Sequence, residues 1–161
     1  LGLGLFYSHP YKDSPSKIQN RLKTIGFIQR HGIAPFVGHF VRNLFPPAFV
    51  VDNKQFVEEL IHKTSMHHSD AVIAASHAMI ERGDRTDVLT NLACPTLFIV
   101  GDLDNAISAE HSLQQLSLPK VASVHLLENV GHMGMFEAPV ETLEIMVDFI
   151  DFCNAYAPSS C

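Results

Sequence analysis

Residues 94–104 read CPTLFIVGDLD, an apolar, β-rich run that begins at a proline and ends in glycine and aspartates. A short, continuous hydrophobic segment of this kind is typical of a strand buried on both faces, as in parallel sheets. Two further strands are expected over 1–7, where an apolar run ends before a Ser-His-Pro tripeptide, and over 121–127. The pattern therefore predicts a parallel sheet.

The segments between these strands carry the start and stop signals of helices. Ser14 precedes Pro15, the arrangement of a capped helix start, and Gly32 would end that helix after residue 31. Further helices are expected from Pro35 to the Pro46-Pro47 pair and over 53–63, 67–82, 108–116 and 139–154. In the last of these helices, one face would carry Val140, Leu143, Val147 and Ile150.

Strands and helices alternate with short connections in the last part of the chain, which indicates a βαβ arrangement of the α/β class. Residues 13–90 show helical patterns and no convincing strand. We therefore expect three regions. These are a core strand with its loop over 1–12, a helical insertion over 13–90, and a C-terminal core over 91–161.

Composition narrows the class of protein. The 161 residues are 47% apolar and 17% charged, which permits a packed domain and excludes a disordered chain. The formal charge of −6 argues against nucleic-acid binding, and no apolar run reaches the about 20 residues that a membrane span requires.

The three cysteines predict no disulfide framework. Cys94 and Cys153 are expected to be buried thiols, which favours a reducing, cytoplasmic setting.

Two loops carry residues suited to chemistry. Asp104 follows the strand at 94–101, and His132 follows the strand at 121–127. Because the carboxyl ends of parallel strands meet at one edge of the sheet, both side chains are expected on the same face. An aspartate can fix the tautomer of a histidine and stabilise the imidazolium that forms when the histidine takes a proton from a nucleophile. Asp102 is an alternative acid, but its position favours a carboxylate that serves the loop.

At this point the sequence resembles a known family. Residues 82–89 (RGDRTDVL) followed by 94–104 are similar to the cap exit and acid strand of α/β hydrolases. Gly131-His132, followed by Glu137-Ala138-Pro139, resembles that family's histidine loop and the start of its last helix. The resemblance is close over the last half of the chain and looser over the insertion. It is nearest to the branch of esterases, enol-lactonases and haloperoxidase-like enzymes that have a helical cap.

The resemblance implies the fold and the site. The chain would be the C-terminal part of an α/β-hydrolase fold with a helical cap insertion. Asp104 would be the triad acid and His132 the triad base, while Met133 and Phe136, beside the histidine, would contact substrate. Ser108 stands where the family often has a proline, four residues after the acid.

The family's nucleophile is absent from this sequence. It lies in a Gly-x-Ser-x-Gly turn between a strand and a helix, and no serine here has glycines at that spacing. In the family this turn precedes the strand that residues 1–7 resemble. We therefore expect the nucleophile upstream of this chain, and the chain alone to be inactive. Its partner would be the N-terminal half of the same hydrolase or a second copy.

The sequence thus predicts a hydrolase that acts on a carboxylic ester or lactone by a Ser-His-Asp mechanism, with a small ester-like molecule as substrate. The alternative is a non-catalytic binding protein on the same fold. No cofactor is expected. His62, His67 and His68 lack the spacing of a metal-ligand set, so no metal site is predicted either.

Overall fold

The computed structural model describes residues 1–156 and contains a three-stranded parallel sheet. The strands are β1 (Leu3–Phe6), β2 (Thr96–Gly101) and β3 (Ala122–Leu127), in the order β1-β2-β3. Leu3 pairs with Thr96, and Thr96 pairs in turn with Ala122. The three predicted strands and their parallel arrangement are confirmed. No helix among residues 1–156 is both long and apolar enough to cross a bilayer.

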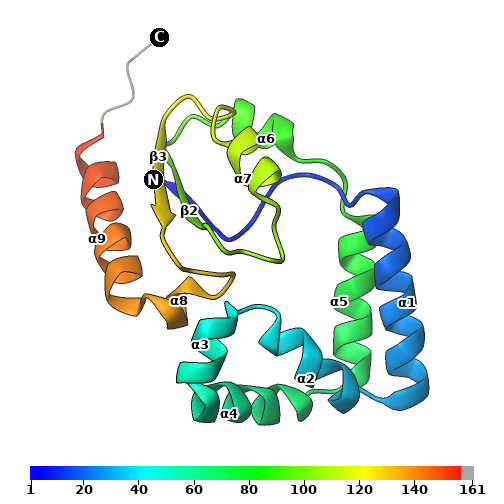
Figure 1. Ribbon diagram of the computed structural model, residues 1–161. Coiled ribbons are helices and arrows are strands. Elements are labelled where there is room, and N and C mark those ends of the chain that lie inside the picture. Colours follow the sequence, from blue (N-terminus) through cyan, green and yellow to red (C-terminus); the bar gives the residue numbers. More distant parts are fainter. Residues whose placement is uncertain (157–161) are drawn as a thin grey trace. The chain divides into compact units, whose positions relative to one another are not determined.

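The central strand β2 is the most deeply buried element, as its continuous apolar sequence predicts. Leu97, Phe98 and Ile99 are at most 1% exposed. Helix α9 (Pro139–Ala155) covers one face of the sheet and α7 (Ala109–Gln115) lies on the other, as Figure 1 shows. Leu97 and Ile99 pack in one cluster with Ile145 and Phe149 of α9. Each such buried side chain stabilises the fold by about 1.5–3 kcal/mol.

Helix α9 is apolar on two faces. The face turned to the sheet carries Thr142, Ile145 and Phe149, which are at most 8% exposed. The face predicted from the sequence pattern is exposed instead, with 48–68% of each side chain accessible at Val140, Leu143, Val147 and Ile150. Both sets repeat at helical spacing, so periodicity alone does not identify the face that packs on the sheet.

The described residues divide into two compact units. The core unit comprises Leu1–Pro10, Leu44–Pro46 and the chain from Arg85 onward, with the sheet, α7 and α9. It also holds two short helices, α6 (Thr86–Thr90) and α8 (Gly134–Glu137). The helical unit comprises Tyr11–Asn43 and Pro47–Asp84.

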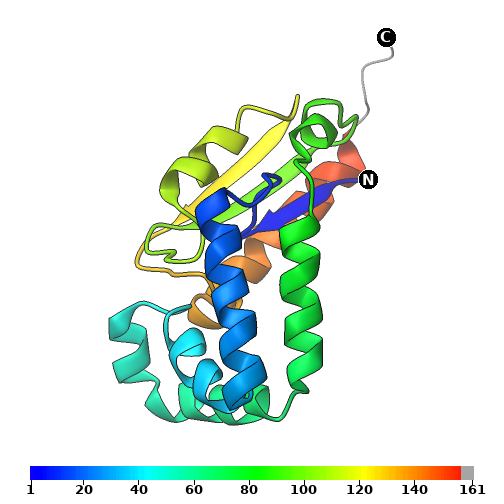
Figure 2. The ribbon, with the colours of Figure 1, turned by 90° about the vertical axis from the view of Figure 1, so that its right-hand side faces the viewer.

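The helical unit is built from five helices. They are α1 (Pro15–His31), α2 (Ala34–Arg42), α3 (Pro47–Asp52), α4 (Lys54–Ser65) and α5 (Ser69–Glu81). Helices α1 and α5 lie side by side, as Figures 1 and 2 show. The Ser14 hydroxyl accepts a hydrogen bond from the Lys17 amide, and Gly32 ends α1 at a φ of 77°. Both predicted helix signals of α1 are therefore confirmed.

Two local predictions are wrong. The helix predicted to run from Pro35 to the Pro46-Pro47 pair ends at Arg42, and Pro47 begins α3, because proline fits the first turn of a helix. Cys94 and Cys153 are free and only partly buried, whereas buried thiols were expected from their apolar neighbours. Cys161 lies outside the described residues.

Gly101 ends β2 where two backbones meet. A Cβ atom there would lie 2.3 Å from the carbonyl oxygens of both Val130 and Gly131. Because backbone atoms cannot rotate away, Gly101→Ala should lower the free energy of unfolding by about 3 kcal/mol, the upper end for overpacking. Urea denaturation followed by circular dichroism measures this.

Gly83→Ala is the matched control, since a Cβ at Gly83 meets no atom within 4 Å. It should change the free energy of unfolding by less than about 1 kcal/mol. Equal stability of the two variants would show that the junction of β2 with the loop after β3 is looser than described.

Candidate active site

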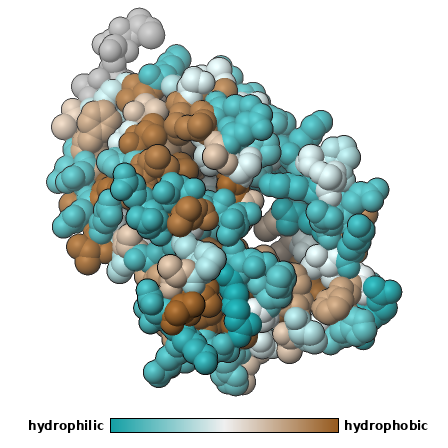
Figure 3. All heavy atoms as spheres, viewed as in Figure 1, coloured by the Kyte–Doolittle hydropathy of each residue, from teal (hydrophilic) through white to brown (hydrophobic). Residues whose placement is uncertain are grey.

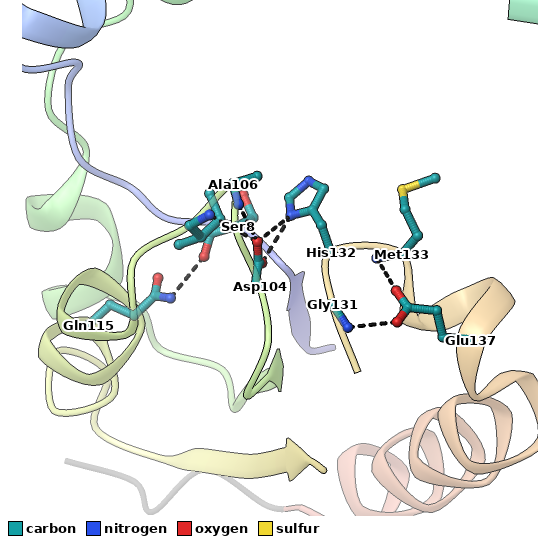
Figure 4. Close-up of polar contacts among 9 residues, drawn as sticks. Ser8, Asp104, Ala106, Gln115, Gly131, His132, Met133 and Glu137 are labelled. Atoms are coloured by element: carbon teal, nitrogen blue, oxygen red, sulfur yellow. Dashed lines mark hydrogen bonds and ion pairs between the residues drawn. The ribbon is translucent and has the colours of Figure 1, made fainter. Parts of the chain in front are cut away.

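The loops that follow β2 and β3 bring Asp104 and His132 into contact. Nδ1 of His132 lies 3.0 Å from Oδ2 and 3.2 Å from Oδ1 of Asp104. The two side chains come from the carboxyl ends of neighbouring strands, and Figure 4 shows them facing each other. The predicted acid and base therefore lie together, as the topological argument requires.

The Asp104 carboxylate is held in one orientation by its own loop. Oδ1 accepts hydrogen bonds from the backbone amides of Ala106, at 2.7 Å, and Ile107, at 3.0 Å. The Asp104 side chain is 3% exposed, whereas that of His132 is 24% exposed. Since Asp104 engages Nδ1, the other ring nitrogen of His132 is the one presented to a reacting group. Figure 4 shows that nitrogen pointing away from Asp104.

Asp102, the alternative acid, has a different partner. Its Oδ1 accepts a hydrogen bond from the Val130 amide at 3.2 Å, so the carboxylate ties the loop after β2 to the loop after β3. The residue is exposed, and no contact joins its carboxylate to His132 among the hydrogen bonds of the described residues. The geometry therefore favours Asp104 as the partner of the histidine.

Three successive backbone amides hold in place the loop around His132, residues 131–133, which we call the histidine loop. The Gly131 amide donates to Oε2 of Glu137 at 2.7 Å, and the Met133 amide donates to Oε1 of the same carboxylate at 2.9 Å. The His132 amide donates to the Leu44 carbonyl at 2.9 Å. Sequence reasoning used Glu137 only as part of a motif and missed Leu44, because a backbone acceptor far along the chain leaves no signal.

The position directly before His132 has no room for a side chain. A Cβ atom at this position would lie 2.8 Å from Cδ of Pro46 and 3.0 Å from the Leu44 carbonyl oxygen. Only glycine therefore lets the histidine loop approach the Leu44–Pro46 turn of the core unit. In this turn Phe45 is 2% exposed, so the turn is anchored by burial.

Tyr7, at the end of β1, lies under the histidine loop. Its ring centroid is 6.0 Å from that of His132 at an interplanar angle of 65°, and the residue is 5% exposed. Its φ of 47° is in the left-handed region, where non-glycine residues are uncommon and local strain collects at functional sites. Burial and the neighbouring Glu137 carboxylate raise the pKa of Tyr7 to about 12. Sequence reasoning placed Tyr7 only at the end of the strand predicted over 1–7 and missed its contact with His132.

The two predicted substrate contacts flank the histidine. Met133 is half-buried, and Figure 4 shows its side chain extending from the loop on the same side as the His132 ring. Phe136 lies on α8 and is 42% exposed.

The three histidines considered as metal ligands, His62, His67 and His68, are exposed residues of the helical unit. Within residues 1–156, no group of three or more His, Cys, Asp or Glu side chains is placed to hold a metal ion.

Comparison with known proteins gives matches at the level of structure only. No family model matches the sequence, and no curated protein matches it. A thermophilic esterase from Thermogutta terrifontis superposes with a TM-score of 0.86 at 23% identity, over 94% of this chain and 56% of the esterase. An enol-lactonase from Burkholderia xenovorans gives a TM-score of 0.83 at 14% identity, over 93% of this chain and 56% of the lactonase.

An esterase from a Rhodococcus species gives a TM-score of 0.73 at 16% identity, over 94% of this chain and 56% of the esterase. This chain therefore spans a little over half the length of the structures that it matches. The matches agree with the parallel sheet and its flanking helices. The chain thus has the fold of the C-terminal part of an α/β hydrolase.

Proposed function

We propose that this chain supplies the acid and the base of a hydrolase that cleaves a carboxylic ester or lactone. The observation that carries the proposal is the 3.0 Å contact between Nδ1 of His132 and Oδ2 of Asp104 at the carboxyl ends of two parallel strands. The similarity to esterases and an enol-lactonase supports the substrate class. The nucleophilic serine belongs to a separate segment.

In this mechanism His132 moves protons between the serine and the substrate. Nε2 takes the proton of the serine hydroxyl as its oxygen attacks the carbonyl carbon, and Asp104 stabilises the imidazolium through Nδ1. The imidazolium then protonates the departing alkoxide, which leaves an acyl-enzyme. Water attacks this ester in the same way, and the acid is released with both His132 and the serine restored.

Met133 and Phe136 contact the acyl or alcohol part of the substrate, since both flank the histidine. Residues 13–90 are the helical cap of this hydrolase, and residues 1–12 and 91–161 are its core. Three cysteines that predict no disulfide framework support a reducing, cytoplasmic setting.

The partner that carries the serine would pack on an apolar surface of the core unit. Strand β1 is an edge of the sheet, and a groove of about 360 Å³ between β1 and α9 is lined by Leu1, Phe6 and Ile150, among others. The exposed apolar face of α9 continues from this groove. Figure 3 shows hydrophobic surface gathered between α9 and the strands. A patch of this kind marks an interaction site.

The assay for this proposal compares the chain alone with the chain joined by its N-terminal hydrolase half. The chain alone should leave p-nitrophenyl acetate unhydrolysed, because a base without a nucleophile forms no acyl-enzyme. The assembled enzyme should turn over the ester, and a serine-directed inhibitor should abolish this activity. Sedimentation of the mixture checks that the two parts associate.

Three outcomes would contradict the proposal in different ways. Inhibitor-sensitive turnover by the chain alone would place a nucleophile within these residues. A stable monomer that ignores the N-terminal half, or pairs only with a second copy through β1, would refute the proposed partner. An assembled but inert protein across a panel of esters and lactones would favour the alternative of a binding protein.

A further inference from the structure

The carboxylate of Glu137 makes two hydrogen bonds that no catalytic step requires. One oxygen accepts from the Gly131 amide at 2.7 Å and the other from the Met133 amide at 2.9 Å. We call this pair of contacts the Glu137 bridge. It holds the backbone N–H groups of the residues directly before and after His132, as Figure 4 shows.

We propose that Glu137 is a positioning residue, whose carboxylate holds the histidine loop so that Nδ1 of His132 faces Asp104. The inference rests on the proposed function, in which His132 is the base. It assigns to Glu137 no contact with substrate.

The local fold places the carboxylate over the loop. Helix α8 is a single turn in which the Glu137 amide donates to the Met133 carbonyl at 3.1 Å. The turn is tied to α9, because the Thr142 hydroxyl donates to the Gly134 carbonyl at 3.2 Å. Glu137 is thus attached through α8 to the buried Thr142 of α9. The Glu137 bridge in turn restrains the histidine loop.

The orientation of the imidazole depends on its backbone. Among the described residues, the hydrogen bonds of the His132 ring go to Asp104 alone. The ring is therefore aimed by the backbone torsions of residues 131–133, and these are fixed by the Glu137 bridge and the His132–Leu44 bond. A misplacement of about 1 Å at a reacting group can lower turnover by about 10²-fold.

The bridge requires an ionised carboxylate. Both oxygens accept hydrogen bonds from backbone amides. A glutamine has one oxygen and one NH₂ group, so its NH₂ group would face the N–H of Gly131 or Met133, and two donors cannot bond to each other. Protonation of Glu137 has the same effect. The pKa of the Glu137 carboxyl is raised, mainly by burial and also by the Asp104 charge. The hydrogen bonds from the two backbone amides, together with His132, offset part of this rise. Tyr7, directly after β1, is a further titratable group beside it, since the Glu137 carboxylate raises the pKa of Tyr7.

The first test compares Glu137→Gln with Glu141→Gln in the assembled enzyme. Glu141 is an exposed glutamate in the first turn of α9 and serves as the matched control. We expect Glu137→Gln to lower kcat by about 10²-fold with KM unchanged, since a misaligned base affects chemistry more than binding. The low-field NMR resonance of the His132 Nδ1 proton should broaden or vanish in this variant only.

The second test needs no substitution and therefore does not depend on a variant that folds. As the pH falls through the Glu137 pKa, the amide proton resonances of Gly131 and Met133 should shift together. The Thr96 amide, which bonds to the Val121 carbonyl, should not follow them. In a folded Glu137→Gln variant this joint titration should be absent.

The results separate this inference from the proposed function. If His132→Ala abolishes turnover while Glu137→Gln behaves like Glu141→Gln, the positioning role is refuted and the function stands. A joint titration that is missing from the unmodified enzyme, or that persists in Glu137→Gln, also refutes it. If His132→Ala retains turnover, the proposed function fails instead, and the NMR measurements still report whether the bridge orients the ring.

Discussion

His132→Ala in the assembled enzyme should lower turnover by about 10⁶-fold, the loss seen when the base of a serine hydrolase is removed. Without the imidazole, no group accepts the serine proton as the carbon–oxygen bond forms, and none returns a proton to the leaving alkoxide. Substrate affinity should change little. Steady-state kinetics on an activated ester, with active sites counted by a serine-directed inhibitor, measures the loss.

His125→Ala is the control for loss of a histidine from the core unit. His125 lies on β3, where Nε2 contacts the Ser123 hydroxyl at 3.1 Å, and its strand position places it away from the histidine loop. This variant should keep near-normal turnover. If His132→Ala retains more than about a hundredth of the activity, the proton passes through another group and the assignment of the base is wrong.

Much of the core unit could be predicted from the sequence, because its strands are continuous apolar runs. The run at 94–101 predicts β2 within two residues, and parallel topology brings Asp104 and His132 to one edge before any distance is known. That juxtaposition follows from chain order and strand direction alone. It depends on no detail of side-chain packing.

The features that the sequence did not predict depend on contacts between distant residues. The Leu44 carbonyl accepts the His132 amide from 88 positions away, and nothing in the residue type of Leu44 marks it as an acceptor. Tyr7 ends an apolar strand like any core residue, yet its φ of 47° sets it under the histidine loop. The packed face of α9 was also undetermined, since both of its apolar faces have helical spacing.

Asp104→Asn should lower turnover by about 10⁴-fold while the fold stays intact. The asparagine amide oxygen can still accept the amides of Ala106 and Ile107 at the positions held by Oδ1. Its NH₂ group would then face Nδ1 of His132, which favours the tautomer with the proton on Nε2. In that tautomer Nε2 already carries a proton and cannot accept one from the serine. The imidazole is therefore retained but cannot act as the base.

The neighbouring variant Asp102→Asn separates the two candidate acids. Asp102 accepts only the Val130 amide among the hydrogen bonds of the described residues, at 3.2 Å, and an asparagine oxygen can replace that acceptor. Turnover by Asp102→Asn should therefore stay within about tenfold of the unmodified enzyme, because the contact is structural and the side chain is exposed. Near-normal turnover in Asp104→Asn together with a large loss in Asp102→Asn would reverse the assignment. It would require the histidine loop to move until Nδ1 of His132 reaches the Asp102 carboxylate.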